Sequence, residues 1–370
     1  MITMLELGGA QGNTLYTVSH LDRNRFEPHL ICGRGGMLDP EASSLELASL
    51  TFCDSLVREI RPVKDFQAYR ELTSLLQKMK PHIVHTHSSK AGVIGRLAAA
   101  AAGVPVVIHT YHGFGFHRYQ NPLWFQGYLQ AERMACKRTH HLIFVSRDNW
   151  NWAKKLGLTA RCSASLIHSG IPVERILSTP RKEELRLEIG VPPDAKLAGM
   201  IACLKPQKDP VTYVRSAARV LQKSPPHHFL LAGDGELRDA VLREAAALPP
   251  GHFHFLGWRR DVYEILKVLD LLVLTSLWEG LPRVIPEAIV SRVPVVASNI
   301  DGNREILQAT GAGLLAEPRG AEDFSEKILM ALSGDVRVDD LSAQYVRREF
   351  DIDDMIDAQE RLYLELMERS

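Results

Sequence analysis

Short apolar segments alternate with longer stretches of helical periodicity along both halves of the chain. In the first half they predict a helix at residues 90–102 and strands at residues 2–7, 27–32, 83–85, 106–110 and 142–145. After a charged, proline-bearing stretch, a second series predicts strands at residues 197–202, 228–232, 253–256, 269–274 and 293–297. Strands that alternate with helices are typical of parallel sheets, so we expect two α/β units.

The length of the chain also favours two domains, because its 370 residues suffice for two hydrophobic cores. We expect an N-terminal domain of residues 1–170 and a C-terminal domain of residues 171–350. Residues 351–370 predict an acidic amphipathic helix that returns to the N-terminal domain; its apolar side chains are Ile352, Met355, Ile356, Leu362 and Leu366. Open α/β sheets bind ligands outside the carboxyl ends of their strands, so we expect the site in a cleft between the domains.

The overall composition is ordinary, but charge is distributed unevenly between the two halves of the chain. Hydrophobic residues make up 45% and charged residues 24% of the chain, which is typical of globular proteins. The formal net charge is zero, but residues 1–170 hold 19 Lys/Arg and 12 Asp/Glu, whereas the remainder holds 25 and 32. Two interpretations stay open: an anionic partner of the N-terminal half, such as a lipid phosphate or a membrane surface, or ordinary solvated charge. No nucleic-acid partner is expected.

Cysteine usage and hydropathy favour a cytoplasmic protein. The five cysteines are widely spaced and form no Cys-x-x-Cys pair, which predicts neither a disulfide framework nor a zinc site. The first residues form no apolar signal core, and no window of about 18 apolar residues follows. We therefore expect a cytoplasmic location, at most peripheral at the inner face of the membrane. We also expect a few native residues upstream of the first strand.

A glycine pair follows the first predicted strand. Gly8 and Gly9 open the next helix, where free backbone N–H groups and the helix dipole attract anions. The segment lacks the Gly-x-Gly-x-x-Gly pattern with an acidic residue about 20 positions later, so a nicotinamide-dependent dehydrogenase is disfavoured. On this pattern alone, a tight turn without a ligand is the favoured interpretation.

Histidines crowd the ends of two predicted strands, at His82, His85, His87, His109, His112 and His117. A His-x-His pattern places two imidazoles on one face of a strand, but no acidic residue or cysteine completes a metal site. A histidine at a strand end can instead donate a hydrogen bond to a sugar. His112, which is followed by Gly113, is our candidate for that role.

The C-terminal half carries charges that suit a nucleotide sugar. Lys205 and Lys208 follow a predicted strand and could contact a diphosphate, although two exposed loop lysines would give the same pattern. Glu279 and Glu287 follow a later strand. If a helix begins near Pro282, its first amides lie beside Glu279 and Glu287 lies about a turn and a half in, where its two oxygens can accept both ribose hydroxyls.

Together these stretches resemble the family 4 glycosyltransferases of the GT-B fold. The resemblance runs through residues 5–14, 81–115, 167–173, 200–210, 233–237, 255–262 and 275–305. Its most specific parts are residues 85–92, the His112-Gly113 pair and the Glu-x7-Glu pattern of Glu279 and Glu287. It implies two Rossmann-like domains that face a central cleft. It also implies a retaining transferase that moves a sugar from a nucleoside diphosphate, with a UDP-sugar expected, to a polysaccharide, lipid-linked or cell-envelope acceptor.

The resemblance also implies roles for residues. Lys208 is expected to contact the diphosphate, Glu287 the ribose, and Glu279 with the following amides the transferred sugar. The expected catalytic residues are His112, Glu279 and Lys208. The expected donor-binding residues are Gly8, Gly9, Lys205, Lys208, Gly233, Glu236, Arg259, Gly280, Leu281, Pro282, Arg283 and Glu287.

Neither a metal nor another cofactor is expected, since members of this family work without one and the only Asp-x-Asp lies at residues 351–353. One departure is Cys203, which stands where the family commonly has an arginine; Lys205 or Arg283 would then supply the missing charge. Two alternatives stay open: a nucleotide-sugar epimerase of the same fold, and a non-catalytic nucleotide-binding relative, which Cys203 motivates.

The segment of residues 114–128 is rich in aromatic side chains, which are Phe114, Phe116, Tyr119, Trp124, Phe125 and Tyr128. They are expected to contact acceptor or lipid, particularly beside Arg118, or to pack internally. We expect about half of them to pack.

Overall fold

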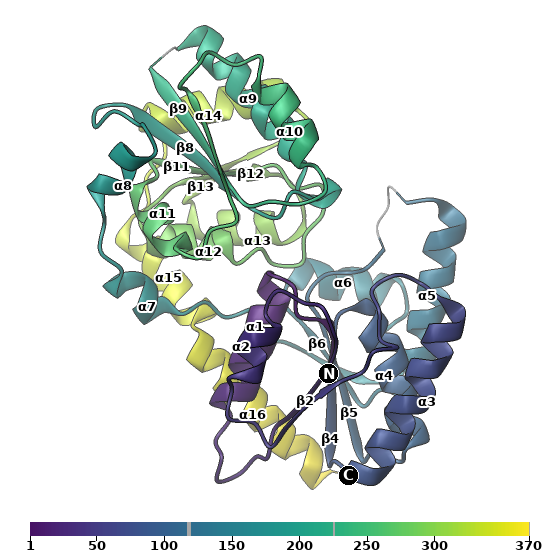
Figure 1. The fold of residues 1–370 in the computed structure, drawn as a ribbon. Coiled ribbons are helices and arrows are strands. Elements are labelled where there is room, and N and C mark those ends of the chain that lie inside the picture. The colour runs from purple at the N-terminus through teal and green to yellow at the C-terminus, as the bar shows by residue number, and fades with distance from the viewer. Residues whose placement is uncertain (117–119, 225, 370) are drawn as a thin grey trace. The chain divides into compact units, whose positions relative to one another are not determined.

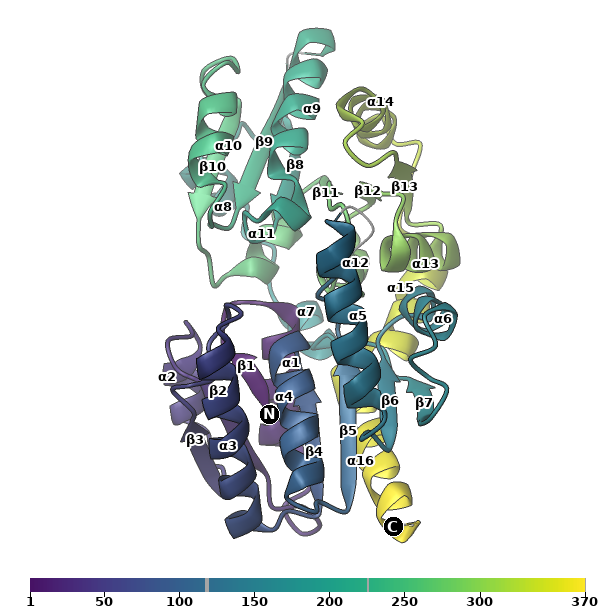
Figure 2. The same cartoon turned by 90° about the vertical axis from the view of Figure 1, so that its right-hand side faces the viewer.

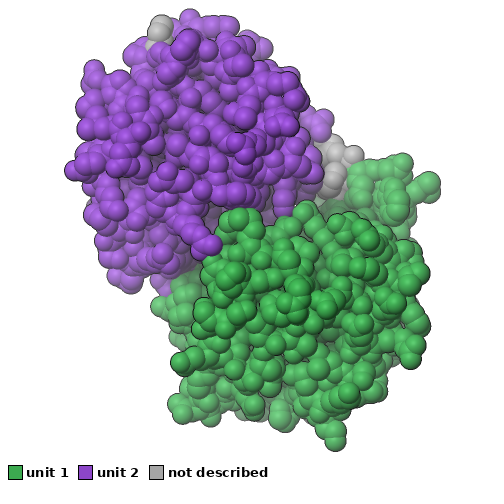
Figure 3. All heavy atoms as spheres, in the orientation of Figure 1, with its two compact units in different colours: residues 1–170, 352–370 green, residues 171–351 purple. Residues whose placement is uncertain are grey.

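The computed structural model describes residues 1–116, 120–224 and 226–369 and confirms the predicted parallel α/β architecture (Figure 1). The chain forms two compact units, which Figure 3 colours separately. Unit 1 comprises Met1–Gly170 with Ile352–Ser370, and unit 2 comprises Ile171–Asp351. Each unit has its own parallel strands and its own buried apolar residues.

Unit 1 contains parallel strands in the orders β3-β2-β1 and β4-β5-β6-β7. A backbone hydrogen bond of 2.8 Å from His87 N to Met1 O connects the two sets. The strands are β1 (Ile2–Met4), β2 (His29–Gly33), β3 (Ser49–Phe52), β4 (Ile83–His87), β5 (Val106–Tyr111), β6 (His141–Phe144) and β7 (Ser163–Leu166).

Helices cover both faces of these strands (Figures 1 and 2). On one side lie α1 (Gly9–His20), α2 (Asp39–Ser43) and α16 (Ile352–Glu368); on the other lie α3 (Pro62–Met79), α4 (Ser89–Ala101), α5 (Pro122–Cys136) and α6 (Arg147–Lys155). Consecutive residues of β5 serve opposite faces, because side chains alternate along a strand. Val107 packs with the α3–α4 core, and Ile108 packs with the core that includes α16.

The C-terminal helix returns to unit 1, as predicted. Ile352, Met355 and Ile356 of α16 are buried in one cluster with strand residues such as Val106 and Ile143. Polar contacts flank the cluster: Tyr16 Oη donates to Asp353 Oδ1 at 2.6 Å, and Asp22 N donates to Glu360 Oε1 at 2.7 Å.

Unit 2 holds one parallel sheet in the order β10-β9-β8-β11-β12-β13. Its strands are β8 (Lys196–Ile201), β9 (His227–Ala232), β10 (Phe253–Gly257), β11 (Leu271–Leu274), β12 (Val295–Ser298) and β13 (Gly313–Ala316). Its helices are α7 (Val173–Ser178), α8 (Glu183–Glu188), α9 (Pro210–Lys223), α10 (Arg238–Ala245), α11 (Val262–Val268), α12 (Val284–Val290), α13 (Asp301–Thr310), α14 (Ala321–Leu332) and α15 (Asp340–Phe350), with a 3-10 turn η1 (Pro206–Lys208).

Candidate functional site

The strand order of unit 2 reverses direction between β8 and β11. The chain first builds outward from β8 to β9 and β10, and then returns to the other side of β8 with β11, β12 and β13. Ligands of doubly wound sheets bind at such a switch point, outside the carboxyl ends of the strands. The two loops that leave this point, residues 202–209 and 275–283, contain half of the expected donor-binding residues.

The structure brings Lys208 and Glu279 together at this switch point. The two side chains form an ion pair in which the lysine is one-fifth exposed and the carboxylate is almost fully buried. Glu279 also accepts hydrogen bonds from Ser276 Oγ at 2.6 Å and from Gln207 Nε2 at 3.3 Å. The Lys208 ammonium group and two neutral donors thus fix a buried carboxylate, which is the kind of preorganised charge that active sites use.

Further hydrogen bonds connect the two loops directly. Leu277 N donates to Gln207 O at 2.7 Å, and Thr275 Oγ1 donates to Asp209 O at 2.8 Å. The sequence interpretation did not include Gln207, Thr275 or Ser276. Their position immediately after β8 and β11 was the available signal, but neutral side chains at strand ends are too common to single out from sequence.

The helix after Glu279 begins later than expected. We expected a start near Pro282, whereas α12 begins at Val284 and Glu287 lies in its first turn. The loop that precedes α12 packs closely against the start of α13. A Cβ on Gly302 of α13 would lie 2.3 Å from Gly280 O in this loop, so only glycine at position 302 permits the contact. Leu281 and Pro282 are buried in the same loop.

Glu287 is the second buried carboxylate of this region. It is 7% exposed and lies 3.5 Å from Arg283 Nη2, one turn earlier on the helix. Burial raises the pKa of Glu287, and the Arg283 guanidinium opposes that rise. Burial together with the nearby Glu287 charge also raises the pKa of Tyr263 to about 12. Arg283 Nε is buried without a hydrogen-bond partner among the described residues. Arg283 therefore acts first as the counter-ion of Glu287.

The remaining expected residues of unit 2 differ in their surroundings. Gly233, with a φ of 134°, lies so close to the end of β8 that a Cβ would be 1.9 Å from Ala202 O. Lys205 is partly buried in the loop after β8, near Cys203 in sequence, and Glu236 is exposed. Arg259 is already engaged, because its Nε donates to Asp261 Oδ1 at 2.7 Å.

In unit 1, Gly8 and Gly9 are exposed at the start of α1. Gly8 caps the helix in an extended conformation, and no acidic residue lies in the first turn. The adjoining strand ends carry hydroxyls: Thr3 Oγ1 lies 2.6 Å from Ser88 Oγ. Backbone amides at the start of a helix suit an anion or a sugar hydroxyl.

His112 directly follows β5 and forms a pair with a second imidazole. Its Nε2 lies 3.0 Å from His87 Nδ1. Burial lowers the pKa of His87 well below its usual value, so this neighbour stays neutral. Gly113 has a φ of 140°, which explains the glycine after His112. His82 is exposed before β4, away from this end of the strand, and His117 lies outside the described residues.

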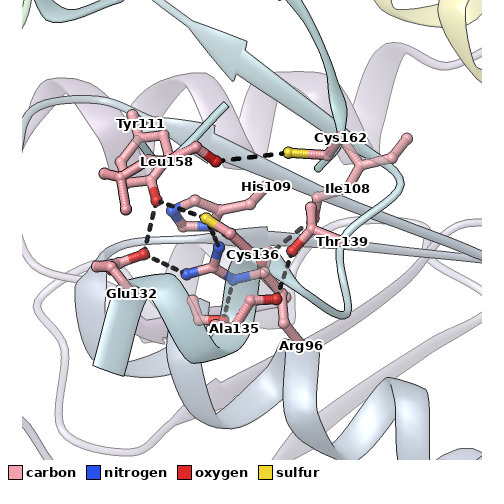
Figure 4. Close-up of polar contacts among 12 residues, drawn as sticks. Arg96, Ile108, His109, Tyr111, Glu132, Ala135, Cys136, Thr139, Leu158 and Cys162 are labelled. Carbon is pink, nitrogen blue, oxygen red and sulfur yellow. Dashed lines mark hydrogen bonds and ion pairs between the residues drawn. The ribbon is translucent and has the colours of Figure 1, made fainter. Parts of the chain in front are cut away.

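A buried polar network lies next to His112 in the sequence and beneath the sheet (Figure 4). Arg96 of α4 is fully buried and pairs with Glu132 of α5 at 2.5 Å. Tyr111 Oη, from the residue before His112, donates to the same carboxylate oxygen at 2.6 Å. Arg96 and Tyr111 also contact Cys136 Sγ at 3.7 Å. The network therefore fixes the end of β5 against two helices.

Some aromatic side chains of the segment 114–128 are packed in the core, and others are exposed. Phe114 and Phe116 are buried in the core, with Phe125 and Tyr128 packed against it. Trp124 is 59% exposed, while Tyr119 and Arg118 lie outside the described residues. Within the described part of the chain, no three His, Cys, Asp or Glu side chains are arranged to hold a metal ion.

Comparisons with known proteins agree with this geometry. Residues 7–175 match the family described as Glycosyltransferase Family 4, and residues 181–348 match Glycosyl transferases group 1. A relative from Escherichia coli, named UDP-Gal:alpha-D-GlcNAc-diphosphoundecaprenol alpha-1,3-galactosyltransferase, is 33% identical over 86% of this chain and 83% of its own length. A Campylobacter jejuni relative, N,N'-diacetylbacillosaminyl-diphospho-undecaprenol alpha-1,3-N-acetylgalactosaminyltransferase, is 27% identical over 80% of each chain.

Solved structures share the fold at low sequence identity. HepE from Anabaena, in complex with UDP and glucose, has a TM-score of 0.83 at 17% identity and covers 98% of this chain and 97% of its own. Sucrose-phosphate synthase from Thermosynechococcus elongatus has a TM-score of 0.80 at 16% identity, covering 98% and 94%. The matched regions, the relative at 33% identity and these structural matches show that the chain belongs to the family 4 glycosyltransferases of the GT-B fold.

Proposed function

We propose that this glycosyltransferase moves a hexose from a UDP-sugar to a saccharide on a diphosphate-linked polyprenol, with retention of anomeric configuration and without a metal. The observation that carries the donor proposal is the pairing of Lys208 with buried Glu279 at the switch point of the unit 2 sheet. The acceptor proposal rests on the names of two relatives, both of which specify diphospho-undecaprenol acceptors and alpha-1,3 linkages.

Lys208 is proposed to bind the diphosphate and to stabilise the charge that develops on it as the sugar leaves. Its side chain is one-fifth exposed, while Glu279 holds the ammonium group at the ends of β8 and β11. Bound phosphate would share Lys208 with Glu279. The carboxylate would then accept hydrogen bonds from hydroxyls of the transferred sugar, with the amides of Gly280 and Leu281 beside it.

Glu287 is proposed to accept the two ribose hydroxyls, and Arg283 to keep it ionised in its buried position. Gly233, Glu236 and Arg259 are proposed to line the base. From unit 1, His112 is proposed to hydrogen-bond a sugar, and Gly8 and Gly9 to offer backbone amides to the donor.

Cys203 bears on how the diphosphate charge is balanced. With a thiol at this position, we propose that Lys205 in the same loop complements Lys208, because Arg283 is already paired with Glu287. Lysine and arginine charges and backbone amides would then stand in for a metal ion.

The acceptor is proposed to be reached at the cytoplasmic surface of a membrane. No helix among residues 1–116, 120–224 and 226–369 is long and apolar enough to cross a bilayer. A polyprenol acceptor would place the reacting saccharide at the lipid–water interface, so peripheral association is part of the proposal.

The test combines donor binding with transfer. Calorimetry and thermal shifts with UDP, GDP, ADP and NAD are measured in EDTA and then with magnesium, since a ligand of the native state raises its stability. Radiolabelled UDP-galactose and UDP-N-acetylgalactosamine are next offered with a GlcNAc-diphospho-lipid, and the product anomer is read by NMR. UDP binding and α-product in EDTA support the proposal. Binding without transfer to any acceptor supports a non-catalytic relative, and absence of UDP binding overturns the donor class.

A further inference from the structure

The first turns of α3 and α5 expose large apolar side chains. Val63 and Phe66 of α3 are 73% and 61% exposed, and Ile60 just before the helix is 50% exposed. Leu123 and Trp124 of α5 are 83% and 59% exposed. Single exposed apolar residues are ordinary, but a set at the starts of two helices marks a candidate interaction surface. We call these five residues the α3–α5 surface.

The two helices begin at the same edge of unit 1. Each follows a parallel strand, α3 after β3 and α5 after β5, so both start near the carboxyl ends of the strands. α4 lies between them and packs against both (Figure 2). Lys90 in the first turn of α4 pairs with Asp65 of α3 at 2.6 Å, which fixes the start of α3 to this layer.

The charge around the surface is positive. Residues 55–170 hold 16 Lys/Arg and 5 Asp/Glu. Between residues 120 and 138 the only carboxylate is Glu132, and it is buried against Arg96. Arg133 in the last turn of α5 and Lys137 and Arg138 directly after the helix are exposed, so this segment carries basic side chains without an exposed acid.

The start of α3 also carries more basic than acidic side chains. Arg61 and Lys64 flank Val63, and Asp65 is already neutralised by Lys90. Glu59 is exposed 4.0 Å from Arg61. Exposed Trp, Leu and Phe together with Lys and Arg are typical of surfaces that lie on an anionic bilayer without spanning it.

We propose that the α3–α5 surface binds the anionic phospholipid bilayer in which the acceptor lipid is embedded. Leu123, Trp124 and Phe66 enter the interface between headgroups and acyl chains, while Arg61 and Lys64 lie at the phosphates. The choice of a membrane over a protein partner rests on the proposed function, whose acceptor is a lipid, and on the excess of positive charge.

The test is sedimentation of the full chain with vesicles of phosphatidylcholine alone or with about 30% phosphatidylglycerol. We expect binding to the anionic vesicles and release by salt, because salt screens surface charge. Leu123→Ser with Trp124→Ser is expected to weaken binding at least about 10-fold. Arg61→Gln with Lys64→Gln is expected to weaken it about 5-fold for each charge removed.

Matched controls come from unit 2. Leu341→Ser removes a leucine that is 74% exposed, and Lys223→Gln with Arg243→Gln removes two exposed charges; none of these should change vesicle binding. UDP affinity and thermal midpoint should stay at the wild-type value in every variant. They report on the donor site and on folding separately from the membrane surface, so failure of the proposed function is recognised independently.

Three outcomes would overturn the proposal. One is equal binding to neutral and anionic vesicles, and another is wild-type binding by the Leu123→Ser/Trp124→Ser variant. The third is conversion of a wild-type oligomer to a monomer by that variant without any vesicle binding, which would assign the surface to self-association. Loss of transfer to vesicle-embedded acceptor, with transfer to detergent-solubilised acceptor retained, would support it.

Discussion

Both units are built from parallel strands covered by helices, but they place their buried charges differently. In unit 1 the Arg96–Glu132 pair lies beneath the strands between α4 and α5, while the strand ends carry glycines, hydroxyls and neutral histidines. In unit 2 the Lys208–Glu279 and Arg283–Glu287 pairs lie on the loops at the carboxyl ends of the strands. Parallel α/β units thus bury an ion pair between helices in unit 1 and place two at the strand ends in unit 2.

The position of an ion pair indicates whether it contributes to the stability of the fold or to the binding of a ligand. A buried ion pair enclosed by packed helices contributes to stability and packing alone, because no ligand reaches it. An ion pair at a switch point is part of the surface that a ligand contacts. We therefore expect substitutions at the first kind to change stability, and substitutions at the second kind to change binding and turnover.

The largest expected effect is on the stability of unit 1. Arg96→Met should lower the free energy of unfolding by about 3–5 kcal/mol, because Glu132 would remain charged and buried without its partner. Arg96→Met with Glu132→Gln should recover much of this loss, since the amide still accepts from Tyr111. Calorimetry measures both. The control is Arg215→Met, whose exposed pair with Glu244 should contribute less than about 1 kcal/mol. Equal effects of the two single variants would contradict the comparison.

The next effect is on turnover in unit 2. Glu279→Gln should reduce kcat by about 100-fold, because it removes a preorganised charge beside the transferred sugar. UDP affinity should be retained or increased, since Lys208 loses a competing carboxylate. Steady-state kinetics and calorimetry distinguish the two, with Glu326→Gln, at an exposed glutamate of α14, as the control. A variant with wild-type kcat would remove Glu279 from the catalytic proposal.

A smaller effect is expected on nucleotide affinity. Glu287→Ala should weaken UDP binding by about 1.5–3 kcal/mol, the usual contribution of hydrogen bonds to a charged acceptor. His112→Ala, in unit 1, should reduce transfer while leaving the affinity for UDP alone close to wild type. Calorimetric titration of UDP into both variants measures the contrast. Unchanged affinity in Glu287→Ala would show that the ribose binds elsewhere.

The smallest effect is a shift in pH dependence. Burial already raises the pKa of Glu287 and Arg283 opposes it, so Arg283→Gln should raise that pKa further. Protonated Glu287 cannot accept hydrogen bonds from both ribose hydroxyls. UDP affinity should therefore fall as pH decreases, and the fall should begin at a higher pH in the variant than in the wild type. Arg283→Lys should restore the wild-type profile, whereas superimposable profiles for Arg283→Gln would exclude the counter-ion role.

The hydrophobic pattern was sufficient to predict the strands whose residues are continuously apolar. The predicted strands at residues 106–110 and 228–232 correspond to β5 and β9, whose side chains are buried on both faces. The pattern missed β3, β7 and β13. These strands have four residues each, and β7 reads Ser-Ala-Ser-Leu, so short half-buried edge strands leave little apolar signal.

The sequence alone determined the family, the parallel α/β architecture and the return of the C-terminal helix, because each depends on local pattern or motif. Only the tertiary structure decided which charges pair. Lys208 meets Glu279 across 71 positions, and Arg96 meets Glu132 across 36, through strand order and helix packing that no local spacing encodes. The close approach of Gly280 O likewise depends on Gly302, a residue of another helix. Charged residues that are distant in sequence and pair only after folding can therefore be identified only from the tertiary structure.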